Sequence, residues 1–175
     1  TTSAIINFDN GTLRTTRDDN NLIRLNGTGV REVNILAGGA TIDSAGHNVR
    51  IGNAISGSAG GAFNKNGAGQ LVLEQVNTYD GPTNINAGAL VMGGTPATSS
   101  LTVAAGAGIG VEDPANTLGS LTVPTVSLGA GATLTIETGN DGTSSEKFIV
   151  NGSGALDISS GLGLVLNQDN TPNGS

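Results

Sequence analysis

The feature that most constrains the fold of this chain is a short signal, a glycine followed two positions later by a leucine, that recurs after a short interval. It occurs at Gly69-Gln70-Leu71 and again at Gly88-Ala89-Leu90, and each copy opens a short apolar run. Between the copies lie a turn-like stretch at 77–82 and an alternating polar and apolar stretch at 83–86. Recurrence over so short a distance is typical of a chain that winds into stacked coils.

Similar glycine-then-strand signals occur before and after this pair, and they predict the number of coils. The glycines concerned are Gly11, Gly39, Gly69, Gly88, Gly108, Gly131 and Gly154, and the steps between them are uneven. Such steps are expected to vary where coils differ in loop length. At about 20–25 residues per coil, the chain predicts roughly eight coils whose Leu, Val and Ile side chains line one continuous core.

Short apolar runs occur along the whole chain, and most of them alternate apolar with polar residues, as in Leu101-Thr102-Val103. This alternation marks a strand with one buried face. A β-sandwich would use longer strands around a larger core, and a propeller would show a period of about 40 residues with recurrent aromatic residues. Since only 2% of the residues are aromatic, we predict one all-β domain over residues 1–175, a right-handed single-stranded parallel β-helix (β-solenoid). One short helical turn is expected within 15–25.

Charge and cysteine content exclude several classes of function. The net charge is −7. The arginines of residues 1–50 are interleaved with acidic residues, and most of the charged residues in 51–175 are acidic. A chain of this kind repels phosphate backbones, so nucleic-acid binding is not expected. The sequence contains no cysteine, which excludes disulfides and thiolate metal sites.

Residues 67–92 carry a pattern, GxGxLxLxxxNTYxGxTxxxxGxL, that resembles the passenger-associated repeat of bacterial autotransporters. The matching residues are Gly67, Gly69, Leu71, Leu73, Asn77, Thr78, Tyr79, Gly81, Thr83, Gly88 and Leu90. Segments 6–14, 37–51 and 144–166 are more weakly similar to the sequences that flank this repeat in such passengers. Pro82 departs from the family, which usually has Gly or Thr there. Because proline lacks a backbone donor, we expect it at a turn or at the start of a strand.

The resemblance implies a non-enzymatic role as a structural stalk of a secreted or surface protein of a Gram-negative bacterium. It also implies that the chain is a fragment of a longer passenger, whose leader and C-terminal outer-membrane barrel lie elsewhere in the parent chain. The expected partners are the neighbouring coils and that barrel, and a host or matrix ligand is a further candidate. Two alternatives stay open: an adhesin whose exposed loops bind such a ligand, and a polysaccharide-degrading β-helix enzyme.

Few residues suggest catalysis or metal binding, and no catalytic residue, cofactor or metal ligand is predicted. His47, the only histidine, lies in a turn-like stretch without a Ser or Cys partner at a recognisable spacing, which favours a structural role. The acidic pairs Asp18-Asp19 and Glu112-Asp113 lack the clustered basic neighbours of a glycan-cleaving site. Segments 137–142 and 167–170 are rich in oxygen ligands but do not match a calcium-binding loop, so hydrogen-bonded turns are the simpler interpretation.

Overall fold

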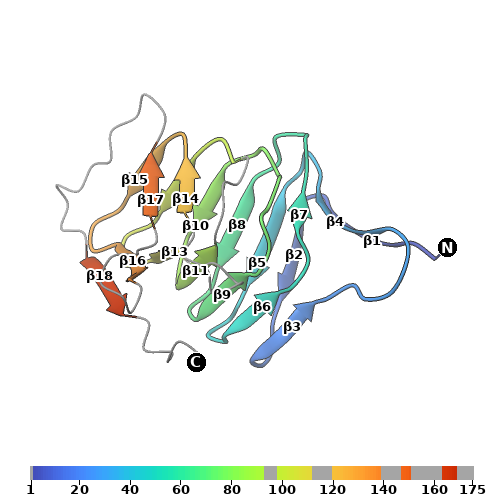
Figure 1. The fold of residues 1–175 in the computed structure, drawn as a ribbon, viewed down its shortest axis with the longest axis horizontal. Coiled ribbons are helices and arrows are strands. Elements are labelled where there is room, and N and C mark those ends of the chain that lie inside the picture. The colour runs from blue at the N-terminus through green and yellow to red at the C-terminus, as the bar shows by residue number, and fades with distance from the viewer. Residues whose placement is uncertain (1, 93–97, 112–119, 139–146, 151–162, 169–175) are drawn as a thin grey trace, which may run out of the picture.

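The computed structural model describes residues 2–92, 98–111, 120–138, 147–150 and 163–168 (Figure 1). Within these residues the chain forms eighteen strands and no helix. Every strand pairing among them is parallel. None of the described segments is a helix that could cross a lipid bilayer.

The strands fall into four sheets, which we name A to D. Sheet A contains β1 (Ala4–Phe8), β4 (Arg31–Ile35) and β7 (Ile55–Ser56), in that order. Sheet B contains β2 (Gly11–Arg14), β5 (Ala40–Asp43), β8 (Phe63–Asn66), β10 (Thr83–Ile85), β12 (Leu101–Val103) and β15 (Val126–Leu128). Sheet C contains β3 (Asp19–Ile23), β6 (Val49–Ile51), β9 (Gln70–Leu73), β11 (Ala89–Met92), β13 (Gly108–Val111), β16 (Thr133–Thr138) and β18 (Gly163–Gln168). Sheet D pairs β14 (Ser120–Val123) with β17 (Lys147–Val150).

In its first three circuits the chain visits sheets A, B and C in turn, and in the next two it passes from sheet C to sheet B; each circuit is one coil of a solenoid. Coil 1 is β1–β3, coil 2 is β4–β6 and coil 3 is β7–β9, while coil 4 carries β10 and β11 and coil 5 carries β12 and β13. Figure 1 shows these strands side by side along the long axis of the molecule. The predicted all-β solenoid with parallel strands is confirmed.

The number of coils differs slightly from the prediction of roughly eight, since the solenoid has about five turns. Beyond coil 5, β15 continues sheet B, and β16 and β18 continue sheet C. The first coil is long, because residues 24–30 form a loop between β3 and β4. This loop separates β1 from its partner β4 and β2 from its partner β5. The prediction also treated all the glycine signals as one series. Gly11 belongs to sheet B and Gly39 directly precedes a sheet B strand, whereas Gly69, Gly88 and Gly108 lie at the starts of sheet C strands. Gly154 lies outside the described residues.

The predicted helical turn within 15–25 is wrong, because β3 occupies Asp19–Ile23. Its pairing with β6 is irregular between Asp19 and Ile23. The apolar residues Leu22, Ile23 and Leu25 suggested a helix because they do not alternate with polar ones. Pro82, by contrast, lies where expected, directly before β10, and its carbonyl accepts a hydrogen bond from Phe63 N at 2.8 Å.

The core is a column of inward-facing side chains that runs through the coils. On sheet B one such row stacks Leu13, Ile42, Lys65, Ile85, Val103 and Leu128 in register. Burial differs along the column, since Ile6, Phe8 and Leu13 of coil 1 are only partly buried, whereas the inward residues of coils 2 to 5 are almost all fully enclosed. All three strands of coil 1 lie at sheet edges among the strands that the structure describes.

Candidate functional site

The leucines of the predicted repeat lie in the hydrophobic core. Leu71 and Leu73 lie on β9, and Leu90 lies on β11 in register with Leu71. All three are at most 1% exposed. They lie in the same rows as Val49 and Ile51 of coil 2. The prediction that the leucines of these short apolar runs line the core is therefore confirmed.

Two glycines of the repeat leave room for the neighbouring coil. Gly88 begins the turn into β11 with φ of +66°, a left-handed conformation that L side chains rarely adopt, and a Cβ there would overlap the carbonyl oxygen of Gly69 in the coil below. Gly81 has no such backbone requirement, yet a Cβ on it would overlap the carbonyl oxygen of Gly61. Both residues therefore stand where the backbones of successive coils come close together.

The side chain of Asn77 makes a hydrogen bond that a neighbouring strand would otherwise make in sheet A. In coil 4, where residues 74–92 are all described, no strand continues from β7, so the backbone N–H of Ile55 has no ladder partner there. The Asn77 side chain, fully buried, accepts that N–H through Oδ1 at 2.9 Å and donates through Nδ2 to Gln75 O at 2.8 Å. Thr78 N donates to Ile55 O at 2.8 Å. At Ile55 the backbone of coil 4 thus bonds the C=O, and the side chain of Asn77 bonds the N–H.

Tyr79 and Thr83 belong to a buried hydroxyl network that joins coils 4 and 5. Tyr79 Oη lies 2.8 Å from Thr83 Oγ1, which lies 3.0 Å from Thr98 Oγ1, and Thr98 donates to the carbonyl of Gly81 at 2.8 Å. All three side chains are at most 1% exposed. Burial raises the pKa of Tyr79, and the hydrogen bond with Thr83 works against that shift. The Tyr79 ring also stacks on Phe63 of coil 3, with centroids 5.5 Å apart.

Thr78 differs from its two neighbours in the motif, because its side chain is exposed. It lies beside Asn34, Leu36 and Ser56 in a shallow groove of about 360 Å³ on the outer face of sheet A. Of the Asn-Thr-Tyr triplet, the structure therefore buries Asn77 and Tyr79 and leaves Thr78 facing outward.

Lys65 is the residue of this region that the sequence analysis missed. It faces inward on β8, is fully buried, and donates from Nζ to the carbonyls of Asn66 at 3.0 Å, Gly67 at 2.7 Å and Ala87 at 3.1 Å. Burial lowers its pKa from 10.5 to about 8, with the charge of Asp43 opposing the shift. The signal was present, because Lys65 is in phase with Phe63 in the alternating run Phe63-Asn64-Lys65-Asn66.

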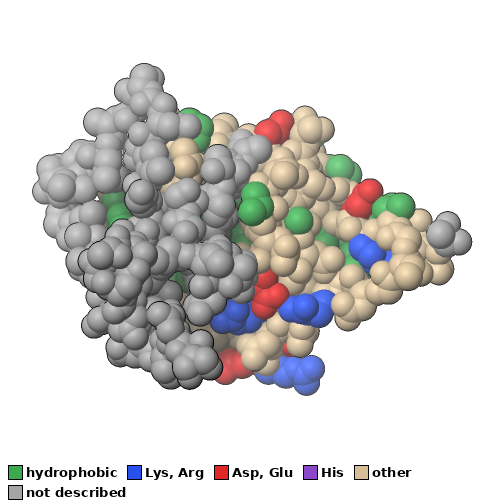
Figure 2. All heavy atoms as spheres, viewed as in Figure 1, with side chains coloured by type: hydrophobic (Ala, Val, Ile, Leu, Met, Phe, Trp, Pro, Cys, Tyr) green, Lys and Arg blue, Asp and Glu red, His purple; other side chains and the backbone are tan. Residues whose placement is uncertain are grey.

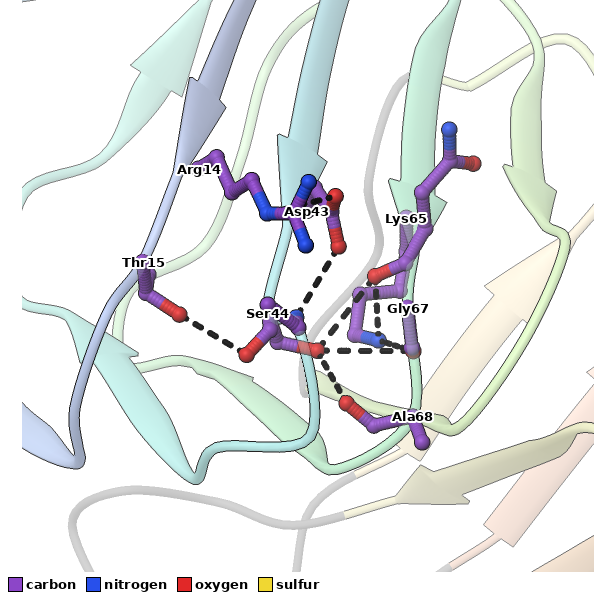
Figure 3. Close-up of polar contacts among 9 residues, drawn as sticks. Arg14, Thr15, Asp43, Ser44, Lys65, Gly67 and Ala68 are labelled. Atoms are coloured by element: carbon purple, nitrogen blue, oxygen red, sulfur yellow. Dashed lines mark hydrogen bonds and ion pairs between the residues drawn. The ribbon is translucent and has the colours of Figure 1, made fainter.

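Lys65 is the third of three buried donors at the corner between sheets B and C (Figure 3). In coil 1, Thr15 Oγ1 donates to Ser44 O at 2.8 Å, and in coil 2, Ser44 Oγ donates to Ala68 O at 2.7 Å. In coil 3, Lys65 reaches Ala87 of the next coil in the same direction. Each donor thus adds a side-chain hydrogen bond to a turn carbonyl of the next coil. The carbonyls of Ser44 and Ala68 also accept backbone N–H groups, from His47 and Gly46.

The remaining sequence candidates do not converge on a site. His47 Nδ1 lies 3.3 Å from Asp18 Oδ1, which also accepts the N–H of Asn48 at 3.0 Å, so this contact joins coils 1 and 2. Asp19 accepts the N–H of Asn21 at 2.8 Å, as in a turn. Glu112-Asp113 and parts of segments 137–142 and 167–170 lie outside the described residues. Among the described residues, no three His, Cys, Asp or Glu side chains are grouped to hold a metal.

The charged side chains of the outer surface are mixed in sign. Glu74 lies 2.6 Å from Arg24 and 3.6 Å from Arg50, and thus ties coils 1, 2 and 3 together. Figure 2 shows acidic and basic side chains close to one another on the face it presents. Such interleaving does not make the basic stripe that nucleic-acid binding requires.

Comparison with known families identifies one segment of the chain. Residues 63–92 match the family model of the passenger-associated-transport-repeat. The match confirms the resemblance drawn from residues 67–92 and extends it back to Phe63, the start of β8. No curated protein and no solved structure matches this chain.

Proposed function

We propose that this chain is a stalk segment of an autotransporter-like surface or secreted protein, which supports secretion and holds another region of the parent chain away from the membrane. The observation that carries the proposal is the match of residues 63–92 to the passenger-associated-transport-repeat. That stretch contains β8 to β11, in which β8 pairs with β10 and β9 pairs with β11. The repeat therefore includes two layers of the solenoid that stack directly on each other.

The polar chemistry of the repeat supports a structural role. Asn77, Tyr79, Thr83 and Lys65 are all fully buried, and each makes hydrogen bonds within or between coils. Buried side chains whose donors and acceptors are already paired within the protein add rigidity and are not available to a substrate. These residues thus stiffen a rod, which is what a stalk requires.

The topology also supports a role in secretion. Strand partners in this chain are separated by one coil, as Thr83 is from Leu101. Each coil contacts only its neighbours, so folding can proceed coil by coil. Folding of successive coils outside the cell would oppose backward sliding of the chain. The partners in this proposal are the neighbouring coils and a C-terminal membrane barrel of the parent chain.

The test is surface display of the parent protein carrying Asn77→Ala, with Thr78→Ala as the matched control. Asn77 is buried and bonded, whereas the adjacent Thr78 is exposed. Because loss of about 1–2 kcal/mol of stability can change abundance several-fold, we expect Asn77→Ala to reduce display roughly several-fold and Thr78→Ala to leave it unchanged. Wild-type display by an Asn77→Ala protein whose stability is measurably lower would remove the secretion role.

A further inference from the structure

The paired strands β8 and β10 carry asparagines at matching positions. The sequence Phe63-Asn64-Lys65-Asn66 lies under Thr83-Asn84-Ile85-Asn86, so an Asn-x-Asn stretch stacks on another. Asn84 Nδ2 donates to Asn64 Oδ1 at 2.9 Å, and Asn86 Nδ2 donates to Asn66 Oδ1 at 2.8 Å. The outer face of these two coils is therefore a ladder of amides.

This amide ladder cannot by itself select the register. Side chains on a strand alternate between faces, so a slip of two residues keeps every inward residue inward. After such a slip, Asn84 would lie opposite Asn66, or Asn86 opposite Asn64, and amide would still meet amide. In the inward row through Lys65, the neighbouring positions Ile42 and Ile85 are aliphatic, so Lys65 makes the one polar contact of these three that depends on the register.

Lys65 does distinguish the registers. Its ammonium has three donors, and its three carbonyl partners use all of them, two within its own coil and one, Ala87 O, in coil 4. A two-residue slip would move Ala87 about 6.6 Å along the strand direction, beyond hydrogen-bond reach. A charged donor would then be left without its partner in the interior, which is costly.

We propose that Lys65 sets the register in which coil 4 stacks on coil 3. Buried polar groups are best attested in this role, in which they select one arrangement among several of similar apolar burial. The inference does not depend on the proposed function, because it concerns only how two coils of this chain align.

Cysteine trapping tests the proposal, and the native chain contains no cysteine to interfere. The pair Asn64→Cys with Asn84→Cys reports the native register, since these residues are direct partners. The pair Asn66→Cys with Asn84→Cys and the pair Asn64→Cys with Asn86→Cys report slips in the two directions. Cα atoms more than about 7 Å apart cannot be bridged, so each pair closes in one register only.

Each cysteine pair is placed in the wild-type background and in Lys65→Met, a side chain of similar length without the ammonium. The proteins are refolded from denaturant under oxidising conditions, and disulfides are counted by mass spectrometry. We expect the slipped pairs to close on the order of tenfold more often with Lys65→Met than with Lys65, the ratio set by loss of one hydrogen bond to a charged group.

Ile85→Met, in the same inward row, is the matched control and should leave the slipped pairs as rare as in the wild type. Circular dichroism of each variant before trapping confirms that it has refolded. If Lys65→Met refolds and closes only the native pair, or if Ile85→Met raises the slipped pairs equally, the ammonium does not set the register and the proposal is overturned.

Discussion

Coils 3 and 4 stack differently from coils 1 and 2. Between coils 1 and 2 the chain takes a long route from each strand to its partner, as from β1 to β4, whereas between coils 3 and 4 it passes quickly from β8 to β10 and from β9 to β11. The long coils are joined at their corners by one buried hydroxyl, that of Thr15, and by exposed or half-buried groups such as Asp18 and His47. The short coils are joined by side chains that solvent does not reach, such as Asn77 and Lys65.

This difference shows what a short coil requires of its sequence. A long coil has loop residues to spare, so a corner can be adjusted without disturbing the strands. A coil as short as the one that leads from Leu71 to Leu90 has no such reserve, and each corner residue must make a defined contact or leave space for one. That requirement explains in physical terms why a recognisable motif falls on coils 3 and 4. The following changes test whether the two pairs of coils differ in tolerance as their packing indicates.

The largest difference is expected for a charge placed in the core. Leu71→Asp or Leu90→Asp buries an unpaired carboxylate at a position that is fully enclosed, and we expect a loss of more than about 4 kcal/mol in the free energy of unfolding. Ile5→Asp in coil 1 is the control, because Ile5 is 51% exposed, and its cost should stay near or below about 1 kcal/mol. Urea denaturation measures both, and similar midpoints for Leu71→Asp and Ile5→Asp would abolish the contrast.

The next largest effect concerns the space between coils. In Gly81→Ala the new Cβ would overlap the carbonyl oxygen of Gly61, whereas the backbone conformation at Gly81 is one that alanine can adopt. Overpacking of this kind lowers the free energy of unfolding by about 3 kcal/mol. Gly11→Ala in coil 1 is the matched change, since the nearest atom to its Cβ would be Phe8 Cδ1 at 3.8 Å. We expect Gly11→Ala to alter the thermal midpoint little. A Gly81→Ala protein as stable as Gly11→Ala would show that coils 3 and 4 can accommodate an added methyl group between them.

A smaller difference separates two asparagines with the same task. Asn77 Oδ1 accepts the N–H of Ile55 at 2.9 Å in a buried site, and Asn53 Oδ1 accepts the N–H of Leu25 at 2.6 Å in a partly buried one. Asn77→Ala leaves an N–H buried without a partner and should cost about 2–3 kcal/mol. Asn53→Ala should cost about 1 kcal/mol or less, because water can replace the lost acceptor. Equal costs, measured by equilibrium unfolding, would mean that burial does not set the importance of these caps.

The sequence predicted most accurately the part of the molecule with the least freedom. In coils 3 and 4, the spacing of Gly69 and Gly88 predicted the true coil length, and the apolar run that follows each glycine predicted that Leu71 and Leu90 lie in the core. The all-β class and the parallel stacking of strands were also predicted from the short apolar runs and from the glycines that precede them. These features are local, so they leave a periodic trace in the sequence.

Contacts between coils leave no such trace, and here the prediction failed or was silent. The step from Gly39 to Gly69 joined two different sheets, because a signal at a corner does not state which corner it marks. Thr98 was not recognised as a partner of Thr83, since only folding brings them within 3.0 Å. Lys65 was passed over because a lysine is ordinarily exposed, and its three carbonyl partners come from turns that the sequence does not align.

The smallest effect that we predict is a pH dependence of stability that originates in coil 3. The pKa of Lys65 is about 8 in the folded chain and 10.5 when unperturbed. Between these values the unfolded chain binds more protons than the folded one, so stability rises with pH. Over pH 8 to 10 the expected gain is about 2 kcal/mol in the free energy of unfolding. Tyr79 acts oppositely, because its pKa is raised from 10.0, so stability should fall again above pH 10.

Two variants assign this profile to its sources. Lys65→Met removes the group that titrates near pH 8, so its stability should no longer rise between pH 8 and 10, while the fall above pH 10 remains. Tyr79→Phe should keep the rise and weaken the fall. Coils 1 and 2, which are described from Thr2 onward, contain no buried lysine or tyrosine, so they supply no equivalent term. If the rise persists in Lys65→Met, the ammonium is not held in the unfavourable, enclosed state that distinguishes coil 3 from the coils before it.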